Sequence, residues 1–358
     1  MTGRRRKTVV GLLFGGRSAE HEVSLNSAAA VHKHLDPDRF EVVSIFISKD
    51  GRWGRAASPL APPSRLKAAR SFLPWTNKEL PTALKADIYF PVLHGPYGED
   101  GTIQGLLEMA DVPYVGAGVL ASAAGMDKAV MKTLFAARGL PIVKHIALAE
   151  AEWRASPETV LAAIRSGFQI PLFVKPANLG SSVGITKVKA WNDAGRALEA
   201  AFVYDRKVVV EQGVQAREIE CSVLGNDAPR ASLPGELIPH SDSEFYDYAD
   251  KYEKGLTRFK IPAPLPPDRT EEARRLAVEA FRAVECAGLA RVDLFLDEAS
   301  GRFFVNEINT MPGFTAISMY PRLWKVTGLS FADLVEELLR LGFERHAAKK
   351  RRVDRRAP

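Results

Sequence analysis

Two runs of the chain, Ala290-Arg-Val-Asp-Leu-Phe-Leu-Asp297 and Phe303-Phe-Val-Asn-Glu-Ile-Asn309, decide the fold. Polar and apolar side chains alternate through most of the first run, which is the pattern of a half-buried β-strand. The link between the runs, 298–301, is short and ends in glycine, as a tight turn requires. We therefore expect the two runs to form a β-hairpin.

Four polar residues are expected on one face of this hairpin. Arg291 and Asp293 lie two positions apart, as do Glu307 and Asn309, so each pair shares a strand face. The turn length allows Asp293 to lie opposite Glu307. Two carboxylates and an amide oxygen suit Mg²⁺ that also binds phosphates, and Arg291 would stabilise charge on a transferring phosphoryl group. The alternative is a surface hairpin with ordinary ion pairs, which the apolar opposite face disfavours.

A second phosphate-binding feature is the loop Lys175-Pro-Ala-Asn-Leu-Gly-Ser-Ser-Val-Gly184. Backbone amides in such a loop of small residues can bind phosphate oxygens, and Lys175 adds a positive charge. The chain contains no G-x-x-x-x-G-K-[ST] motif, so a P-loop NTPase is excluded.

Three other motifs are incomplete. The segment 180–184 reads G-x-S-x-G, which would make Ser182 a hydrolase nucleophile. That turn must lead into a helix, whereas a strand is expected here. Gly116–Ala121 matches G-x-G-x-x-A but lacks the acidic residue needed roughly 20 positions later. His21-Glu22 lacks the second histidine of a zinc motif, so we do not expect zinc.

Composition narrows the class of protein further. The net charge is +6, but the excess lies in 4–7 and 345–358, so a nucleic-acid-binding surface is not expected. No apolar run approaches the ~20 residues that cross a bilayer, so we expect no membrane segment. Cys221 and Cys286 lie in apolar surroundings, which favours free buried thiols and a reducing cytoplasm.

The remaining chain alternates between strands and helices, which favours an α/β fold with an open parallel sheet in the first ~125 residues. The expected strands there are 8–14, 41–47 and 86–93, and the expected helices are 23–35 and 102–109. Later helices are expected at 126–138, 194–202 and 268–287, and later strands at 172–175, 184–188, 208–211 and 218–224. Asp268 and Glu271 fit a capping box for the last helix.

Several separate segments together resemble the ATP-grasp ligases, and within them the D-alanine–D-alanine ligase family. The resemblance covers about 8–342 and is specific because the segments occur in the family's order. They are Gly15-Gly-Arg-Ser-Ala-Glu-His-Glu-Val-Ser24, Leu93-His-Gly-Pro-Tyr-Gly-Glu-Asp-Gly101, Met126-Asp-Lys128, 175–184, Phe245-Tyr-Asp-Tyr-Ala-Asp-Lys-Tyr252, Arg291-Val-Asp293 and Asn306-Glu-Ile-Asn-Thr-Met-Pro-Gly313.

The resemblance implies an ATP-grasp fold of three α/β domains. These would be an N-terminal domain on the substrate side, a central ATP-grasp subdomain, a C-terminal ATP-grasp subdomain with a lid at 239–260, and a basic disordered tail. The corresponding ranges are 1–125, 126–217, 218–344 and 345–358. ATP would bind between the second and third domains.

The resemblance also implies an activity. ATP would phosphorylate the carboxylate of one D-alanine, and the amine of a second D-alanine would attack the acyl phosphate, giving a peptidoglycan precursor. Asp293, Glu307 and Asn309 match the ligands of two Mg²⁺ (or Mn²⁺) ions, and Arg291 matches the residue at the transferring phosphate. The residues that match ATP contacts are Lys128, Lys175, Ser182, Glu211, Glu218 and Lys251.

Other matches concern the amino-acid substrates. Glu20 matches the carboxylate that binds the ammonium of the first substrate and that orients the active site together with Ser181 and Tyr252. His94 lies near the site of the first substrate. Gly313 and Ser318 match the residues that bind the carboxylate of the second substrate. The Lys251-Tyr252 pair favours D-alanine over D-lactate as second substrate, with D-lactate or D-serine as the alternatives. The adenine segment 210–215 and Met319 depart from the family pattern. The resemblance also implies a homodimer that forms through the first domain.

Overall fold

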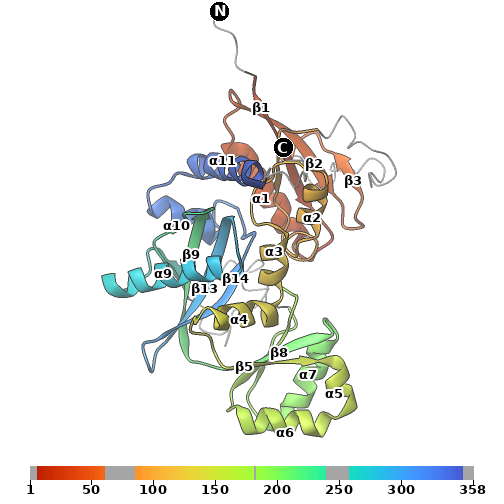
Figure 1. Ribbon diagram of the computed structural model, residues 1–358, viewed down its shortest axis with the longest axis vertical. Helices are drawn as coiled ribbons and strands as arrows, with labels where there is room; N and C mark the ends of the chain where they lie inside the picture. Colours follow the sequence, from red (N-terminus) through yellow and green to blue (C-terminus); the bar gives the residue numbers. More distant parts are fainter. Residues whose placement is uncertain (1–5, 61–84, 181–182, 239–257, 350–358) are drawn as a thin grey trace, which may run out of the picture.

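The computed structural model describes residues 6–60, 85–180, 183–238 and 258–349 (Figure 1). Ser181, Ser182, Lys251 and Tyr252 lie outside the described residues, as does most of the segment expected to form a lid. In the described ranges, three sheets follow one another along the length of the molecule, each with its own helices. The expected α/β class is confirmed.

The first sheet has the order β3-β2-β1-β4. Its strands are β1 (Thr8–Gly15), β2 (Phe40–Ile47), β3 (Trp53–Arg55) and β4 (Ile88–Pro91). β1, β2 and β4 are parallel, as expected, while β3 is an antiparallel edge strand that the sequence did not reveal. Because side chains alternate along β1, Leu12 packs with helix α1 (His21–His34) and Leu13 with helix α2 (Thr102–Met109) on the other side.

The second sheet, β5-β8-β6-β7, is antiparallel throughout. Its strands are β5 (His145–Ala149), β6 (Leu172–Pro176), β7 (Thr186–Val188) and β8 (Lys207–Gln212). Helices α5 (Glu150–Ala155), α6 (Pro157–Gly167) and α7 (Ala194–Phe202) cover one face, with a short 3₁₀ turn at Trp191–Asp193. Val174 and Val210 point toward these helices, so Lys175 and Glu211 point to the opposite face.

The third sheet has the order β12-β11-β9-β13-β14, with β10 beside β9. Its strands are β9 (Ala216–Gly225), β10 (Arg230–Ala231), β11 (Gly235–Ile238), β12 (Arg258–Lys260), β13 (Gly288–Asp297) and β14 (Phe303–Asn309). Helices α3 (Val119–Met126), α4 (Lys128–Ala137) and α9 (Pro267–Ala283) bury its apolar face. Figure 1 shows α4 between the second and third sheets.

Two sequence-based expectations are wrong. The capping box at Asp268 and Glu271 is absent, because α9 begins at Pro267 after Pro266 and has no side-chain cap. The disordered basic tail does not begin at 345, because helix α11 (Phe331–Lys349) continues to Lys349. Arg345 stacks on the Tyr114 ring at 4.0 Å and its Nη1 lies 3.3 Å from Glu108 Oε1, so the helix is fastened to the first domain.

Helix α11 and the preceding α10 (Met319–Val326) follow the third sheet in sequence but pack on the first. Trp324 and Leu338 share a core with Phe14 and Phe90. The first and third sheets are thereby joined by a common apolar core. Within the described ranges, no helix is both long and apolar enough to span a bilayer.

Candidate active site

The hairpin of β13 and β14 forms with the expected register. Asp293 lies opposite Glu307 and Arg291 lies opposite Asn309. The register shifts between Asp293 and Leu294. Asp293 lies opposite Glu307 and Leu294 lies opposite Val305, so Asn306 is an extra residue in β14. Such a bulge re-aims the side chains beyond it. It turns Glu307 away from the buried face that holds Val305 and toward the face that holds Asp293.

Arg291 is held by two carboxylates on this face. Its Nε and Nη2 donate to Asp293 Oδ1 and Oδ2 at 2.7 and 2.6 Å, and Nε lies 3.3 Å from Glu220 Oε2 on β9. Burial alone would lower the pKa of Arg291, but the charges of Asp293 and Glu220 outweigh it and raise that pKa well above its usual value. The guanidinium is therefore a fixed cation beside the expected metal site.

The donor set around Asp293 fits a magnesium ion. Asp293, Glu307 and Asn309 offer hard oxygen atoms, the ligands that Mg²⁺ prefers. Asn309 Oδ1 accepts a hydrogen bond from Met311 N at 3.1 Å, which orients the amide and leaves a second lone pair for a cation. In the part of the chain that the structure describes, no three His, Cys, Asp or Glu residues enclose a metal by themselves. Substrate phosphates would have to complete the coordination.

The face of the second sheet that points toward this hairpin carries a buried charge cluster. Lys175 Nζ donates to Glu211 Oε2 at 2.6 Å, and Lys132 Nζ lies 3.1 Å from Glu211 Oε1. Burial would raise the pKa of Glu211, yet the two lysines lower it to about 2. Glu307 and Glu218 also raise the pKa of Lys175, against the effect of burial, so the cluster faces the acidic hairpin.

Lys128 bridges the two sheets at the first position of α4. Its Nζ donates to Leu179 O at 2.6 Å and lies 3.9 Å from Glu307 Oε2. Asp127 caps the helix by accepting from Ala129 N and Val130 N, both at 3.1 Å. The predicted helix start at Met126 is therefore two residues early, and Lys128 lies between the loop that follows β6 and the hairpin.

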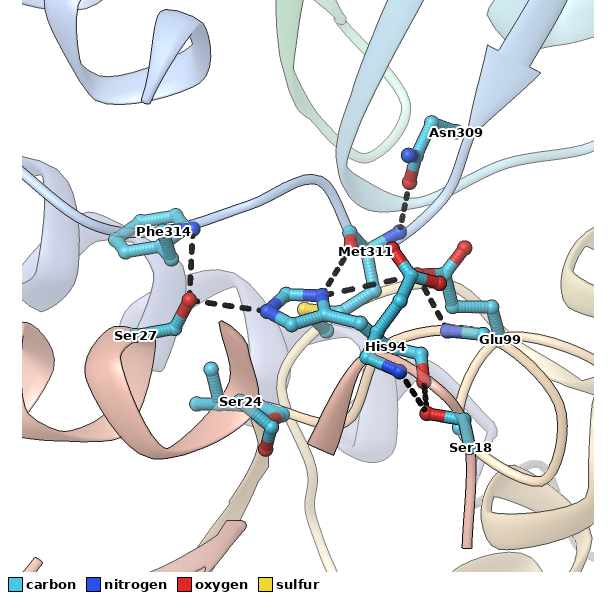
Figure 2. Close-up of polar contacts among 12 residues, drawn as sticks. Ser18, Ser24, Ser27, His94, Glu99, Asn309, Met311 and Phe314 are labelled. Atoms are coloured by element: carbon cyan, nitrogen blue, oxygen red, sulfur yellow. Dashed lines mark hydrogen bonds and ion pairs between the residues drawn. The ribbon is translucent and has the colours of Figure 1, made fainter. Parts of the chain in front are cut away.

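A third group of polar residues lies where the first domain meets the end of β14 (Figure 2). His94 Nδ1 donates to Met311 O at 2.9 Å, and Ser27 Oγ lies 3.0 Å from His94 Nε2. Glu99 Oε1 lies 3.7 Å from His94 Nδ1. Burial would lower the pKa of His94, but Glu99 and Glu20 overcome this and raise it.

Glu20 occupies the N-terminal end of α1 without capping it through its side chain. Its Oε2 is so close to Gly95 and Gly180 that a Cβ on these glycines would lie 2.8 and 3.5 Å away. Glu20 thus reaches both the loop of His94 and the loop that follows β6, at Gly180. Ser18 Oγ fastens the arrangement by donating to His94 O at 2.6 Å.

Gly313 and Ser318 lie together at the start of α10. Ser318 Oγ accepts from Thr315 N at 3.1 Å, and a Cβ on Gly313 would lie 3.1 Å from that Oγ. A helix N-terminus with a hydroxyl is suited to a carboxylate. The sequence did not single out Lys132, Glu99 or Glu220 as site residues, although Glu99 stands five positions after His94 in a quoted motif.

The fold and this juxtaposition of lysines, acidic hairpin and N-terminal loops define a class, the ATP-grasp enzymes. A family model described as "D-ala D-ala ligase N-terminus" matches residues 9–117, and one described as "D-ala D-ala ligase C-terminus" matches residues 134–340. The chain belongs to the D-alanine–D-alanine ligase family.

Individual relatives agree with this assignment. The chain is 48% identical to a D-alanine–D-alanine ligase of Solibacter usitatus, covering 96% of this chain and 98% of the relative. It is 49% identical to one of Bacillus licheniformis, with the same coverages of 96% and 98%. Among solved structures it resembles the D-alanine-D-alanine ligase from Coxiella burnetii, with a TM-score of 0.81, 36% identity and 96% of each chain covered. It also resembles the VanG D-Ala:D-Ser ligase from Enterococcus faecalis, with a TM-score of 0.82, 34% identity and coverages of 94% and 100%.

Proposed function

We propose that this chain joins two D-alanine molecules into D-alanyl-D-alanine at the expense of ATP, for peptidoglycan precursor synthesis. The observation that carries the proposal is a continuous chain of contacts from the hairpin to the first domain. Asn309 Oδ1 accepts from Met311 N, and Met311 O accepts from His94 Nδ1 (Figure 2). A phosphate site and an amino-acid site are thereby joined through three residues.

The reaction needs both sites because a carboxylate resists nucleophiles. Transfer of the γ-phosphoryl group of ATP to a carboxylate oxygen forms an acyl phosphate and releases ADP. The amine of the second D-alanine then attacks the carbonyl carbon, loses a proton, and inorganic phosphate leaves. The new amide bond thus retains one oxygen of the original carboxylate, and the other departs with the phosphate.

The described residues divide these tasks. Lys128 and Lys175 neutralise phosphate oxygens, and Arg291 stabilises charge on the transferring group. Asp293, Glu307 and Asn309 would hold two Mg²⁺ or Mn²⁺ ions, which supply charge neutralisation and phosphate orientation. By resemblance, Ser182 and Lys251 also contact ATP, and Glu211 and Glu218 contact its adenosine part.

The amino-acid site follows the same logic. Glu20 binds the ammonium of the first D-alanine, since an anionic carboxylate at this position pairs with a cation. His94 borders that site. Ser318 and Gly313, at the N-terminus of α10, bind the carboxylate of the second D-alanine. Ser181 and Tyr252 complete the set with Glu20, by resemblance.

The test is phosphate release with ATP and D-alanine, compared with L-alanine, D-serine and D-lactate as second substrate. We expect turnover to depend strictly on D-alanine and the product to be the D,D-dipeptide by mass spectrometry. D-serine is the main competitor, because a D-Ala:D-Ser ligase is among the similar structures. Equal turnover with L-alanine, or preferred incorporation of D-serine, would contradict the proposal.

Three further aspects belong to the same proposal. We place the reaction in the cytoplasm, where ATP is available and the free thiols of Cys221 and Cys286 stay reduced. We infer functional units at 1–125, 126–217 and 218–344, with 239–260 as the lid.

We also infer a homodimer through the first domain, supported by Met109 and Leu120, which are 79% and 59% exposed on the adjacent helices α2 and α3. Sedimentation of the wild type and of Leu120→Glu tests the dimer.

A further inference from the structure

Lys132 is a buried charged residue with no role in the reaction described above. It lies on α4, one turn after Lys128, and only 1% of its surface is exposed. Its Nζ lies 3.1 Å from Glu211 Oε1 and donates to Asn306 O at 3.2 Å. A lysine is rarely buried unless its charge is paired, and both partners here belong to strands of the proposed nucleotide site.

Each partner of Lys132 controls the position of a functional side chain. Glu211 holds Lys175 through its other oxygen, Oε2, at 2.6 Å. Asn306 is the extra residue of the bulge that turns Glu307 toward Asp293. One ammonium therefore connects β8 of the second sheet with β14 of the third.

The charges in the cluster support the same interpretation. Glu211 is ionised, because the two lysines lower its pKa to about 2. Without Lys132, Glu211 and Lys175 would form a neutral pair, and Lys175 would have little charge left for a phosphate. With Lys132 present, two ammonium groups share the single carboxylate of Glu211, so these three side chains together carry one positive charge, which faces Glu307. Burial lowers the pKa of Lys132, while Glu211 and Glu307 oppose that effect.

A lysine that only stabilised the fold would be a poor choice here. A buried ion pair is often no more stable than apolar residues of the same volume. The apolar positions Met131 and Phe135 on the same helix already fill the core against the third sheet. Lys132 instead reaches across the junction of the two sheets.

We propose that Lys132 is a positioning residue. Through Glu211 it aligns Lys175, and through Asn306 it aligns Glu307, so that the phosphates of the nucleotide reach Lys175 and the metal site at Glu307 at the same time. The inference rests on the proposed function for the identity of the nucleotide site. It does not depend on which amino acids are joined.

The test compares the affinities for adenosine and for ADP, measured by calorimetry on the full chain. Lys132→Met keeps the length of the side chain and removes the charge. We expect its affinity for ADP to fall about tenfold further than its affinity for adenosine, since one charge near the phosphates is lost, whereas any change at the adenosine contact of Glu211 affects both ligands alike. Lys132→Arg should recover most of the ADP affinity. Lys144→Met, an exposed lysine of the same region, removes the same charge and should change neither affinity.

The opposing results are distinct. ADP affinity of Lys132→Met equal to that of the wild type would overturn the proposal, as would an equal loss for adenosine and ADP, which is the signature of a structural role. If Lys132→Met does not fold, Lys132→Gln keeps a hydrogen-bond donor without the charge and carries the same expectation and the same contrary outcomes. If the Lys132 variants bind ADP as expected but the wild type shows no D-alanine-dependent phosphate release, the proposed function is contradicted while the role of Lys132 is supported.

Discussion

Asn178 donates two hydrogen bonds to the Asp205 carboxylate, from its backbone N at 2.8 Å and from Nδ2 at 2.9 Å. Asn178 belongs to the loop after β6 that is expected to bind phosphate, and Asp205 to the turn before β8. The same turn supports the far end of the loop, because a Cβ on Gly184 would lie 2.8 Å from the Tyr204 ring. Gly184 has φ +74°, a conformation that glycine adopts without strain. One turn thus fastens both ends of the loop.

Asp205→Ala should therefore loosen the loop without removing any group that touches ATP. We expect KM for ATP to rise about three- to tenfold, equivalent to about 1 kcal/mol for the lost hydrogen bonds, while KM for D-alanine is unchanged. Steady-state kinetics at saturating D-alanine would show this. Asp193→Ala, which removes an exposed carboxylate paired only with Arg196 at 2.8 Å among the contacts described, should leave both constants as in the wild type.

Asp293→Asn should remove most of the turnover. The amide keeps the shape of the side chain but loses the charge that faces the cation, so we expect kcat to fall by at least about 100-fold. The melting temperature, measured by circular dichroism, should change little, because Arg291 retains Glu220 as a partner at 3.3 Å.

The matched control for this change is Asp297→Asn at the exposed end of the same strand. Asp297 accepts from Ser300 N at 2.9 Å in the turn and lies on the same face of β13 as Asp293, but four residues, about 13 Å, further along the strand. Its kcat should equal that of the wild type. Undiminished Mg²⁺-dependent activity in Asp293→Asn would refute the metal-site assignment.

Glu220→Gln should weaken metal binding although Glu220 is not among the proposed ligands. Arg291 now divides its charge between Asp293 and Glu220. With Glu220 neutral, Arg291 would bind Asp293 more tightly, and a cation would have to compete harder for that carboxylate. We expect the dissociation constant of Mn²⁺, measured by electron paramagnetic resonance with ADP present, to rise about threefold to tenfold. An unchanged constant would show that Glu220 does not share Arg291.

The hairpin itself could be predicted from the sequence because alternation and a short turn are local signals. The bulge could not. Strict alternation groups Glu307 with Phe303 and Val305, which are buried, and only the extra residue Asn306 reverses this. The sequence predicts correctly that Glu307 and Asn309 point to the same side of the strand. Which side that is, relative to Phe303 and Val305, depends on the bulge and therefore on tertiary packing.

Other features depended on contacts between distant segments. Lys132 follows the apolar Met131 on a helix, and in the sequence it resembles an ordinary solvated lysine. Its role depends on Glu211, 79 positions later, at 3.1 Å. The basic composition after 344 suggested disorder, but the Tyr114 ring and Glu108 bind Arg345 and extend the order. The capping box failed for a local reason, since Pro267 takes the first helical position.

The protonation state of His94 should change with pH, and Glu99 should raise the pKa at which this occurs. The pKa of His94 is raised, because Glu99 and Glu20 outweigh burial. The stabilisation from the charged imidazole is therefore fully present below the unfolded value of about 6.5 and is lost as pH rises through the higher folded pKa. Glu99→Gln should leave burial dominant and move the pKa of His94 below about 6.5.

Nuclear magnetic resonance of the histidine ring measures this shift directly. The difference in unfolding free energy between wild type and His94→Gln should likewise shrink as pH rises from about 6 to 9. A His94 pKa that is the same in wild type and Glu99→Gln would contradict the electrostatic role of Glu99.

Ser318→Ala should affect the second amino acid and not the first. Ser318 Oγ lies 2.8 Å from Thr315 Oγ1 and is the hydroxyl at the N-terminus of α10, so its loss removes one donor to the carboxylate proposed to bind there. We expect the higher of the two apparent D-alanine constants to rise by about 10- to 100-fold, since a hydrogen bond to a charged group contributes ~1.5–3 kcal/mol. The lower constant and KM for ATP should be unchanged. Ser330→Ala provides the control, because Ser330 pairs with Asp333 at the start of the next helix. A rise in the lower constant alone would place Ser318 at the first D-alanine and reverse the order of the two subsites.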